Sequence, residues 1–108
     1  MQHTPRSIYE ELVTLGEAWA NAHAAAELLE ENKKSVLAKL TITAKGNSQA
    51  AKEASALCEP DYEEHISKMV KARREANLAK VRYDSKKVFV ELLRTKEVTE
   101  RQASRHAP

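Results

Sequence analysis

The sequence predicts an all-α protein in which two long amphipathic helices fold into an antiparallel, coiled-coil-like hairpin. Three observations support this class. Charged residues make up 31% of the 108 residues and aromatic residues only 5%, a composition typical of long helices and coiled coils. The chain holds two glycines and three prolines, too few for the frequent turns of a sheet protein. Apolar residues recur in alternating steps of four and three, the spacing of a helical seam.

The first long helix is expected over residues 7–44. Thr4 can cap a helix that begins with proline, and Ser7 and Glu10 are spaced as a capping box, so two start signals precede the seam. The seam then continues for more than four heptads through Ile8, Leu12, Leu15, Trp19, Ala22, Ala26, Leu29, Lys33, Val36 and Leu40. Lys33 is its one polar member, and it can set the register of a helix pair at a cost in stability.

A connection containing a short helix is expected over residues 46–59. Gly46 suits a left-handed cap after the first helix, because glycine adopts this conformation without steric penalty. Ser48 then has the chemistry to open the short, alanine-rich helix. One domain therefore accounts for the whole chain, residues 1–108.

The last long helix is expected over residues 60–102, followed by a frayed tail over residues 103–108. One apolar series follows a single face through Tyr62, Ile66, Met69, Ala72, Ala76, Ala79, Tyr83, Val90 and Leu93. A second stripe lies on another face and consists of Leu78, Val81, Val88 and Leu92. Because one neighbouring helix covers only one of these faces, we expect a second copy of the chain, or another protein, to complete the bundle.

Folding the rod about its connection brings its two ends together and fixes an expected register. The expected neighbours are Leu40 with Ile66, Leu29 with Ala76, the Ala22/Ala26 gap with Tyr83, and Ile8 with Val98. The first 31 residues hold six acidic residues and one basic residue, whereas residues 68–108 hold twelve basic and five acidic residues. We therefore expect much of this charge asymmetry to be neutralised between the two helices.

The residues with chemical potential do not form a recognisable catalytic or metal-binding pattern. The four histidines include no His-Glu-x-x-His motif, and Cys58 has no ligand set with the spacing of a zinc site. Neighbouring carboxylates such as Glu30 and Glu31 point apart on a helix and are expected to be solvated. We therefore expect a protein that is not an enzyme and binds no cofactor or metal.

Two groups of residues are candidates for intermolecular contact. Trp19 lies on the seam, so it is expected to pack in the core, with an interface anchor as the alternative. Leu78, Val81, Val88 and Leu92 are the candidate protein-contact residues. A basic series occupies the last helix, and its members Lys71, Arg74, Lys86 and Arg101 are expected to face solvent, where they could contact nucleic acid. A solvated, internally neutralised face is the alternative interpretation of these four.

The chain is expected to be cytoplasmic and free of membrane attachment. Its single cysteine, Cys58, suits a reducing compartment. The N-terminus has no apolar run of the kind that a signal peptide needs, and no stretch approaches the roughly 18 apolar residues of a membrane helix.

Three stretches give the last helix a resemblance to a known class of proteins. They are Pro60–Ile66 (PDYEEHI), Ala72–Ala76 (ARREA) and Glu91–Thr95 (ELLRT), with Tyr83 between the last two. Over residues 10–102 the chain resembles small all-helical accessory proteins encoded by bacteriophages and prophages, which often occur among recombination and DNA-metabolism genes. The resemblance implies a viral accessory protein that acts in the bacterial cytoplasm. The second apolar stripe, the rod shape and the absence of an active-site pattern favour a non-enzymatic protein that contacts host or phage DNA-processing proteins. Nucleic-acid binding and a role in phage assembly or scaffolding are the alternatives, and no catalytic residue is carried over.

Overall fold

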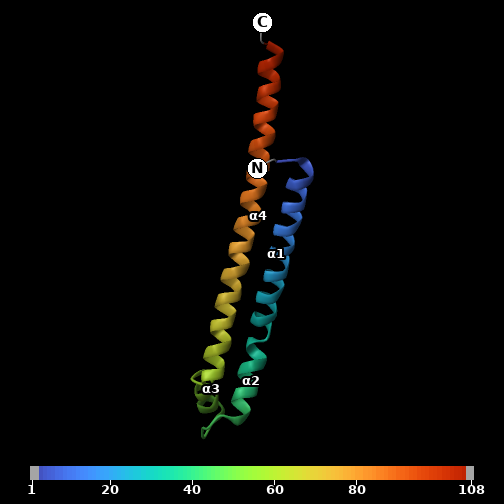
Figure 1. Cartoon of the computed structure of the whole chain (residues 1–108). Coiled ribbons are helices and arrows are strands. Elements are labelled where there is room, and N and C mark those ends of the chain that lie inside the picture. The colour runs from blue at the N-terminus through green and yellow to red at the C-terminus, as the bar shows by residue number, and fades with distance from the viewer. Residues whose placement is uncertain (1–2, 107–108) are drawn as a thin grey trace.

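The computed structural model describes residues 3–106, and within this range every regular element is an α-helix. The helices are α1 (Pro5–Glu31), α2 (Lys33–Thr43), α3 (Gln49–Leu57) and α4 (Pro60–His106). The all-α class predicted from the sequence is confirmed. The molecule is a rod measuring 89 × 21 × 18 Å (Figure 1).

Helix α1 begins at the earlier of the two start signals. Thr4 is the N-cap, and its hydroxyl accepts a hydrogen bond from the Ser7 backbone N–H at 3.0 Å while the Ser7 hydroxyl accepts one from the Thr4 N–H at 3.1 Å. Ser7 therefore closes a capping box with Thr4 rather than opening one with Glu10. Pro5 fits the first helical position because its missing N–H would have no partner there.

The expected single helix over residues 7–44 is interrupted at Asn32. Asn32 keeps helical backbone angles, φ −76° and ψ −9°, but it ends α1, and α2 begins at Lys33. The interruption falls where the seam carries Lys33 in place of an apolar residue, so no packing there compensates for the low helix propensity of asparagine. The polar seam position thus coincides with a break between two helices.

The connection contains the expected short helix, α3, opened by Ser48, whose hydroxyl accepts from the Ala51 N–H. The left-handed cap expected at Gly46 is wrong, because no described residue has positive φ. Gly46 instead allows close approach: a Cβ there would lie 2.8 Å from the Lys52 backbone nitrogen. Glycine is therefore needed for space rather than for backbone conformation.

Helix α4 is longer than expected. It starts at Pro60, as predicted, but continues through residues 103–106 of the expected frayed tail; residues 107–108 lie outside the described range. The C-terminal part of α4 runs past the N-terminal end of α1 (Figure 1), and every residue from Arg94 to Arg105 is exposed.

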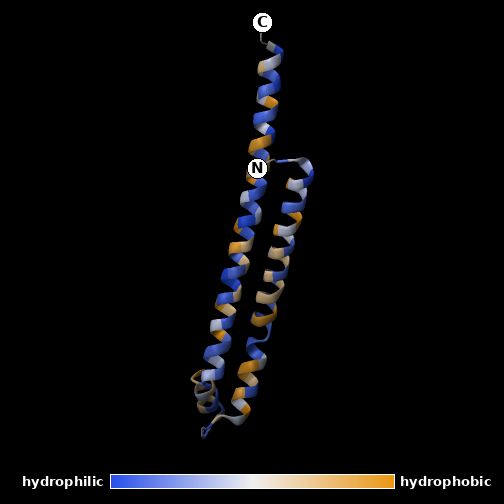
Figure 2. Cartoon of the chain, viewed as in Figure 1, coloured by the Kyte–Doolittle hydropathy of each residue, from blue (hydrophilic) through white to orange (hydrophobic). Residues whose placement is uncertain are grey.

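Helices α1 and α4 lie side by side in opposite directions, and the core between them is built from small residues. The buried apolar residues of these two helices are Ala26, Ala76 and Ala79, while Ala56 is buried on α3, and among the residues described no large side chain is fully buried. Hydrophobic segments recur along the whole of α4, alternating with hydrophilic ones (Figure 2). Small side chains let the helices approach closely, but they leave the larger apolar residues only half covered.

The expected register is wrong by about one heptad. Tyr83 lies against Gly16 and Trp19 rather than against the Ala22/Ala26 gap. Ile8 shares a surface depression with Val90 and Leu93 rather than reaching Val98. The cause is α3, which packs against α2, so that α4 starts beside the body of α2 rather than beside its end.

Candidate protein-contact face of α4

The most distinctive surface of the molecule is an apolar stripe along α4, which we call the outer face. It consists of Val70, Leu78, Val81, Val88 and Leu92, whose exposed fractions are 65%, 39%, 60%, 58% and 64%. These residues recur at helical spacing, so they form one continuous stripe rather than scattered exposed side chains. The structure therefore leaves the second stripe uncovered by the rest of the described chain.

The outer face lies on the side of α4 opposite to α1. Residues nine apart are two and a half turns apart in an α-helix and so point in opposite directions. Val70 and Val88 are each nine residues from Ala79, which is buried, and Val81 is nine residues from Val90, which is half-buried. Helix α4 thus presents one apolar face to α1 and another to solvent.

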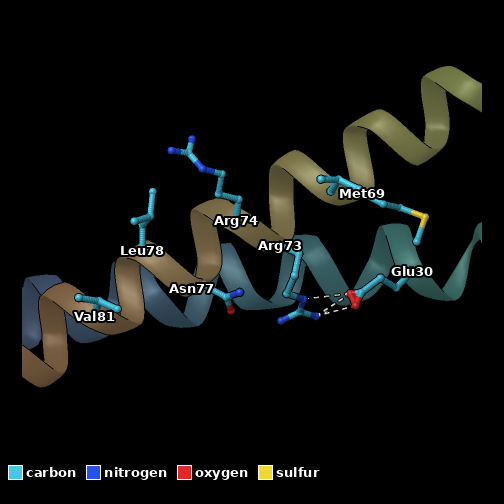
Figure 3. Close-up of a pocket in the computed structure, with 8 residues that line it drawn as sticks. Glu30, Met69, Arg73, Arg74, Asn77, Leu78 and Val81 are labelled. Carbon is cyan, nitrogen blue, oxygen red and sulfur yellow. Dashed lines mark hydrogen bonds and ion pairs between the residues drawn. The ribbon is translucent and has the colours of Figure 1, made fainter.

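An open groove occupies the N-terminal half of the outer face. It is lined by Val70, Arg74, Leu78, Val81 and their neighbours on α4, with Glu30 from α1 at its edge. In Figure 3, Arg74 and Leu78 project away from α1, whereas Arg73 turns towards Glu30. A second depression on α4 continues the apolar surface beside Val88 and Leu92.

A hydrogen-bonded network on the inner side orients this part of α4. Arg73 donates to both carboxylate oxygens of Glu30, at 2.7 and 2.9 Å from Nη2, and its Nη1 donates to His23 Nδ1 at 3.1 Å. His23 then donates from Nε2 to Glu27 at 3.0 Å. The hydrogen bonds with Glu30 raise the pKa of the Arg73 guanidinium above its ordinary high value, so Arg73 stays charged up to strongly alkaline pH.

Trp19 does not belong to the outer face. It lies on α1, half-buried, with its ring stacked on Tyr83 at a centroid distance of 6.0 Å. Lys80 Nζ sits 5.9 Å from the Trp19 ring centroid. These contacts give Trp19 the packing role that was expected first, and the structure does not bring it together with Leu78, Val81, Val88 and Leu92.

The four basic residues considered for nucleic-acid contact do not behave alike. Lys71, Arg74 and Arg101 are exposed, as expected. The expectation that Lys86 faces solvent is wrong: only 13% of its side chain is exposed, because it forms an ion pair with Glu11 of α1 and lies over the Phe89 ring. Its aliphatic stem covers apolar surface between the helices, a common arrangement for lysine.

The charges of α1 and α4 are neutralised between the helices at two ion pairs and not along the whole charged surface. Arg73–Glu30 and Lys86–Glu11 join the two helices, whereas Lys68–Glu64 and Lys87–Asp84 lie within α4. Pairs within one exposed helix contribute little to stability. The two pairs between helices therefore carry most of the expected charge complementarity.

Val70 is a member of the outer face that the sequence pattern did not single out. The spacing could have indicated it: Val70 precedes Val81 by eleven residues, which is close to three full turns, so the two side chains lie on the same face of the helix. It was obscured by its neighbour Met69, which belongs to the series that faces α1.

The described residues offer no cluster of metal-ligating side chains as a second candidate site. Over residues 3–106, no group of three or more histidine, cysteine, aspartate or glutamate side chains could hold a metal ion. His65 is half-buried, and its Nε2 forms a 2.8 Å hydrogen bond with the Leu29 carbonyl oxygen. Within the same residues, no helix has the length and apolar character needed to span a membrane.

The comparisons with known proteins leave the geometry as the basis for any functional conclusion. No protein-family model, no curated protein and no solved structure matches this chain.

Proposed function

We propose that this protein is a non-enzymatic interaction protein that acts through helix faces, with the outer face of α4 as its contact surface. One observation carries the proposal: an apolar stripe runs along α4 on the side that α1 does not cover. Large contiguous apolar surfaces are uncommon on isolated soluble proteins and mark sites of association. The folded unit is an α1–α4 hairpin, and association through the outer face completes its core.

The small buried core supports the same proposal. Alanines dominate the interior, and the large apolar side chains remain partly exposed. Removing apolar surface from water contributes about 25 cal/mol per Å² to stability. A partner that covers the outer face therefore stabilises the folded hairpin to which it binds, because binding buries apolar side chains that the hairpin alone leaves exposed.

The resemblance to phage and prophage accessory proteins extends the proposal to a biological setting. We infer that the protein acts in the bacterial cytoplasm on host or phage DNA-processing proteins. Affinity purification from a phage-infected or lysogenic bacterium tests this setting. Recovery of proteins with no connection to DNA processing would contradict the setting while leaving the contact surface untouched.

Direct nucleic-acid binding is less well supported as the function. Lys86 forms an ion pair with Glu11 and lies over the Phe89 ring, so it does not face solvent. The exposed acidic residues Glu75 and Glu91 alternate with basic residues along α4 and would repel phosphate groups. A mobility-shift titration at low and moderate salt decides this alternative, because phosphate contacts weaken steeply with salt. A scaffolding role predicts large oligomers in light scattering instead of a defined small complex.

Site-specific photo-crosslinking in living bacteria tests the contact surface itself. A photoreactive phenylalanine analogue at Val81 should give protein adducts, since Val81 lies at the centre of the outer face. The same analogue at Tyr9 is the matched control, because Tyr9 is 67% exposed but lies on α1. Equal adducts at both positions, or none at Val81, would contradict the proposal.

A further inference from the structure

We propose that the outer face of α4 is covered by a second copy of this chain, which runs antiparallel to the first. The two-fold axis passes between Ser85 and Lys86 of the two α4 helices. The inference rests on the proposed function and deepens it, because it names the occupant of the contact surface and the register in which it binds. It is carried by a symmetry in the apolar and charged residues of α4.

Four of the five apolar residues of the outer face, all except Val70, are arranged almost symmetrically about Ser85. Leu78 and Leu92 each lie seven residues from it, and Val81 and Val88 lie four and three residues from it. With the axis between Ser85 and Lys86, Leu78 lies within one residue of the level of Leu92 of the second copy, and Val81 lies within two residues of the level of Val88. Ser85 is small and sits at the centre, where it allows the two helices to approach closely.

Two pairs of charged positions near the axis follow the same symmetry with opposite signs. Lys80 and Glu91 are equally distant from the midpoint between Ser85 and Lys86, and so are Asp84 and Lys87. A two-fold axis perpendicular to both helices brings the same flank of each helix together. Lys80 and Lys87 themselves lie towards α1, over the Trp19 and Tyr83 rings, so these two pairs border the interface, and the flank that meets the second copy is the opposite one.

The exposed flank of the outer face carries mirrored charges that lie farther from the axis and meet the second copy. Lys71 mirrors Glu100, and Glu75 mirrors Lys96, and all four side chains are exposed. Between Lys71 and Glu100, no mirrored pair of positions on α4 joins two charges of the same sign. The surface is thus complementary to itself, as an isologous interface requires.

Other registers lose this complementarity. Sliding the second copy by one heptad in one direction places Lys68 opposite Lys96 and Glu64 opposite Glu100. Sliding it by one heptad in the other direction places Arg82 opposite Lys96, and moving the axis onto Lys86 places Lys71 opposite Arg101. Because like charges in contact penalise a pairing, the charges select one register among those that the apolar stripe alone would allow.

The same register gives the C-terminal part of α4 a neighbour. Residues Arg94–Arg105 are all exposed in the single chain, although an isolated helical segment of this length is marginal in water. In the antiparallel pair this segment lies along Ile66–Asn77 of the second copy. Its charged residues Lys96 and Glu100 are those that face Glu75 and Lys71.

Disulfide cross-linking in the full-length protein tests the axis. Cys58 is exposed, so both variants carry Cys58→Ser. Ser85→Cys should form an intermolecular disulfide, because the axis brings the two copies of this position within the Cα separation that a disulfide requires. Thr95→Cys is the matched control; it lies on the same side of α4, but its two copies would be roughly 28 Å apart at 1.5 Å per residue.

The molar mass and the cross-links together separate the outcomes. A dimer that cross-links at Ser85→Cys and not at Thr95→Cys supports the proposal. Cross-links at both positions mean a parallel pair and overturn it, as does a dimer that cross-links at neither position or a chain that remains monomeric. A monomer whose Val81 adducts contain only other proteins would overturn this inference and leave the proposed contact function standing.

Charge reversal tests the register through a second readout. Glu75→Lys should weaken self-association roughly ten-fold, because it turns two favourable pairs with Lys96 into repulsive ones. Adding Lys96→Glu should restore most of the affinity, whereas Glu31→Lys, an exposed change on α1, should leave it unaltered. Equal weakening by Glu75→Lys and by the double variant would overturn the register.

Discussion

The ring of Tyr83 in α4 stacks on Trp19 in α1, with centroids 6.0 Å apart and ring planes inclined by 20°. Among the described residues, it is the one aromatic ring pair that joins α1 to α4. It lies near the middle of the rod, where α1 offers Gly16 and where alanines make up most of the remaining packing. The stability of the helix pair should therefore depend strongly on it.

Trp19→Ala is expected to lower the free energy of unfolding by about 2 kcal/mol, less than the 3–5 kcal/mol typical of a fully buried tryptophan because Trp19 is half-buried. Tyr9→Ala is the control, since Tyr9 is an exposed aromatic residue of the same helix. It should change stability by less than about 0.5 kcal/mol. Urea denaturation followed by circular dichroism measures both, and equal effects would contradict the assignment of Trp19 to the α1–α4 contact.

Gly16→Ala is expected to stabilise the protein by up to about 1 kcal/mol, because alanine favours a helix interior over glycine. A Cβ at Gly16 would lie 3.4 Å from Tyr83 Cε1, a contact that the ring can accommodate. Gly16→Leu should destabilise the protein, since the larger side chain would displace that ring. The same denaturation experiment measures both variants. A loss of stability in the alanine variant would contradict the prediction and would show that the packing of Gly16 against the Tyr83 ring has no room for a methyl group.

Arg73→Lys is expected to lower the melting temperature more than Arg74→Lys. Lysine keeps the charge but cannot reproduce the two-oxygen contact with Glu30 together with the bond to His23. Arg74, the next residue, points away from α1 (Figure 3) and is the matched control. Because Glu30 raises the pKa of Arg73, the charge of this arginine contributes below that pKa and is lost only at strongly alkaline pH. The difference between the variants should therefore persist from pH 6 to pH 9, and similar melting temperatures would contradict it.

The all-helical class was predictable because periodicity, low glycine content and absence of strand-forming runs all point the same way. The start of α4 at Pro60 was predictable for a local reason, since proline suits a first turn and Asp61 and Glu63 favour the positive end of a helix. The exposed stripe followed from the same periodicity, because Leu78, Val81, Val88 and Leu92 fall out of phase with the residues that face α1.

The register between the helices was not predictable in the same way. It depends on where α3 packs, and a short alanine-rich helix has too few distinctive side chains to indicate its neighbour. The position of Lys86 was missed for a related reason: its burial follows from the register that places Glu11 beside it. Both errors arise from contacts between distant residues, which a local pattern does not encode.

His65→Ala is expected to loosen the junction between α1 and α2 while leaving most of the rod intact. His65 Nε2 donates a hydrogen bond of 2.8 Å to the Leu29 carbonyl, three residues before the interruption at Asn32. A hydrogen-bond donor at the C-terminal end of a helix pairs with a carbonyl that has no partner within the helix, and it interacts favourably with the negative end of the helix dipole. Its loss should cost about 1 kcal/mol and should speed amide hydrogen exchange over residues 30–36 before it changes exchange elsewhere. Glu64→Ala, an exposed change at the neighbouring position, is the control, and uniform acceleration along the whole of α1 in the His65 variant would contradict a local role for this bond.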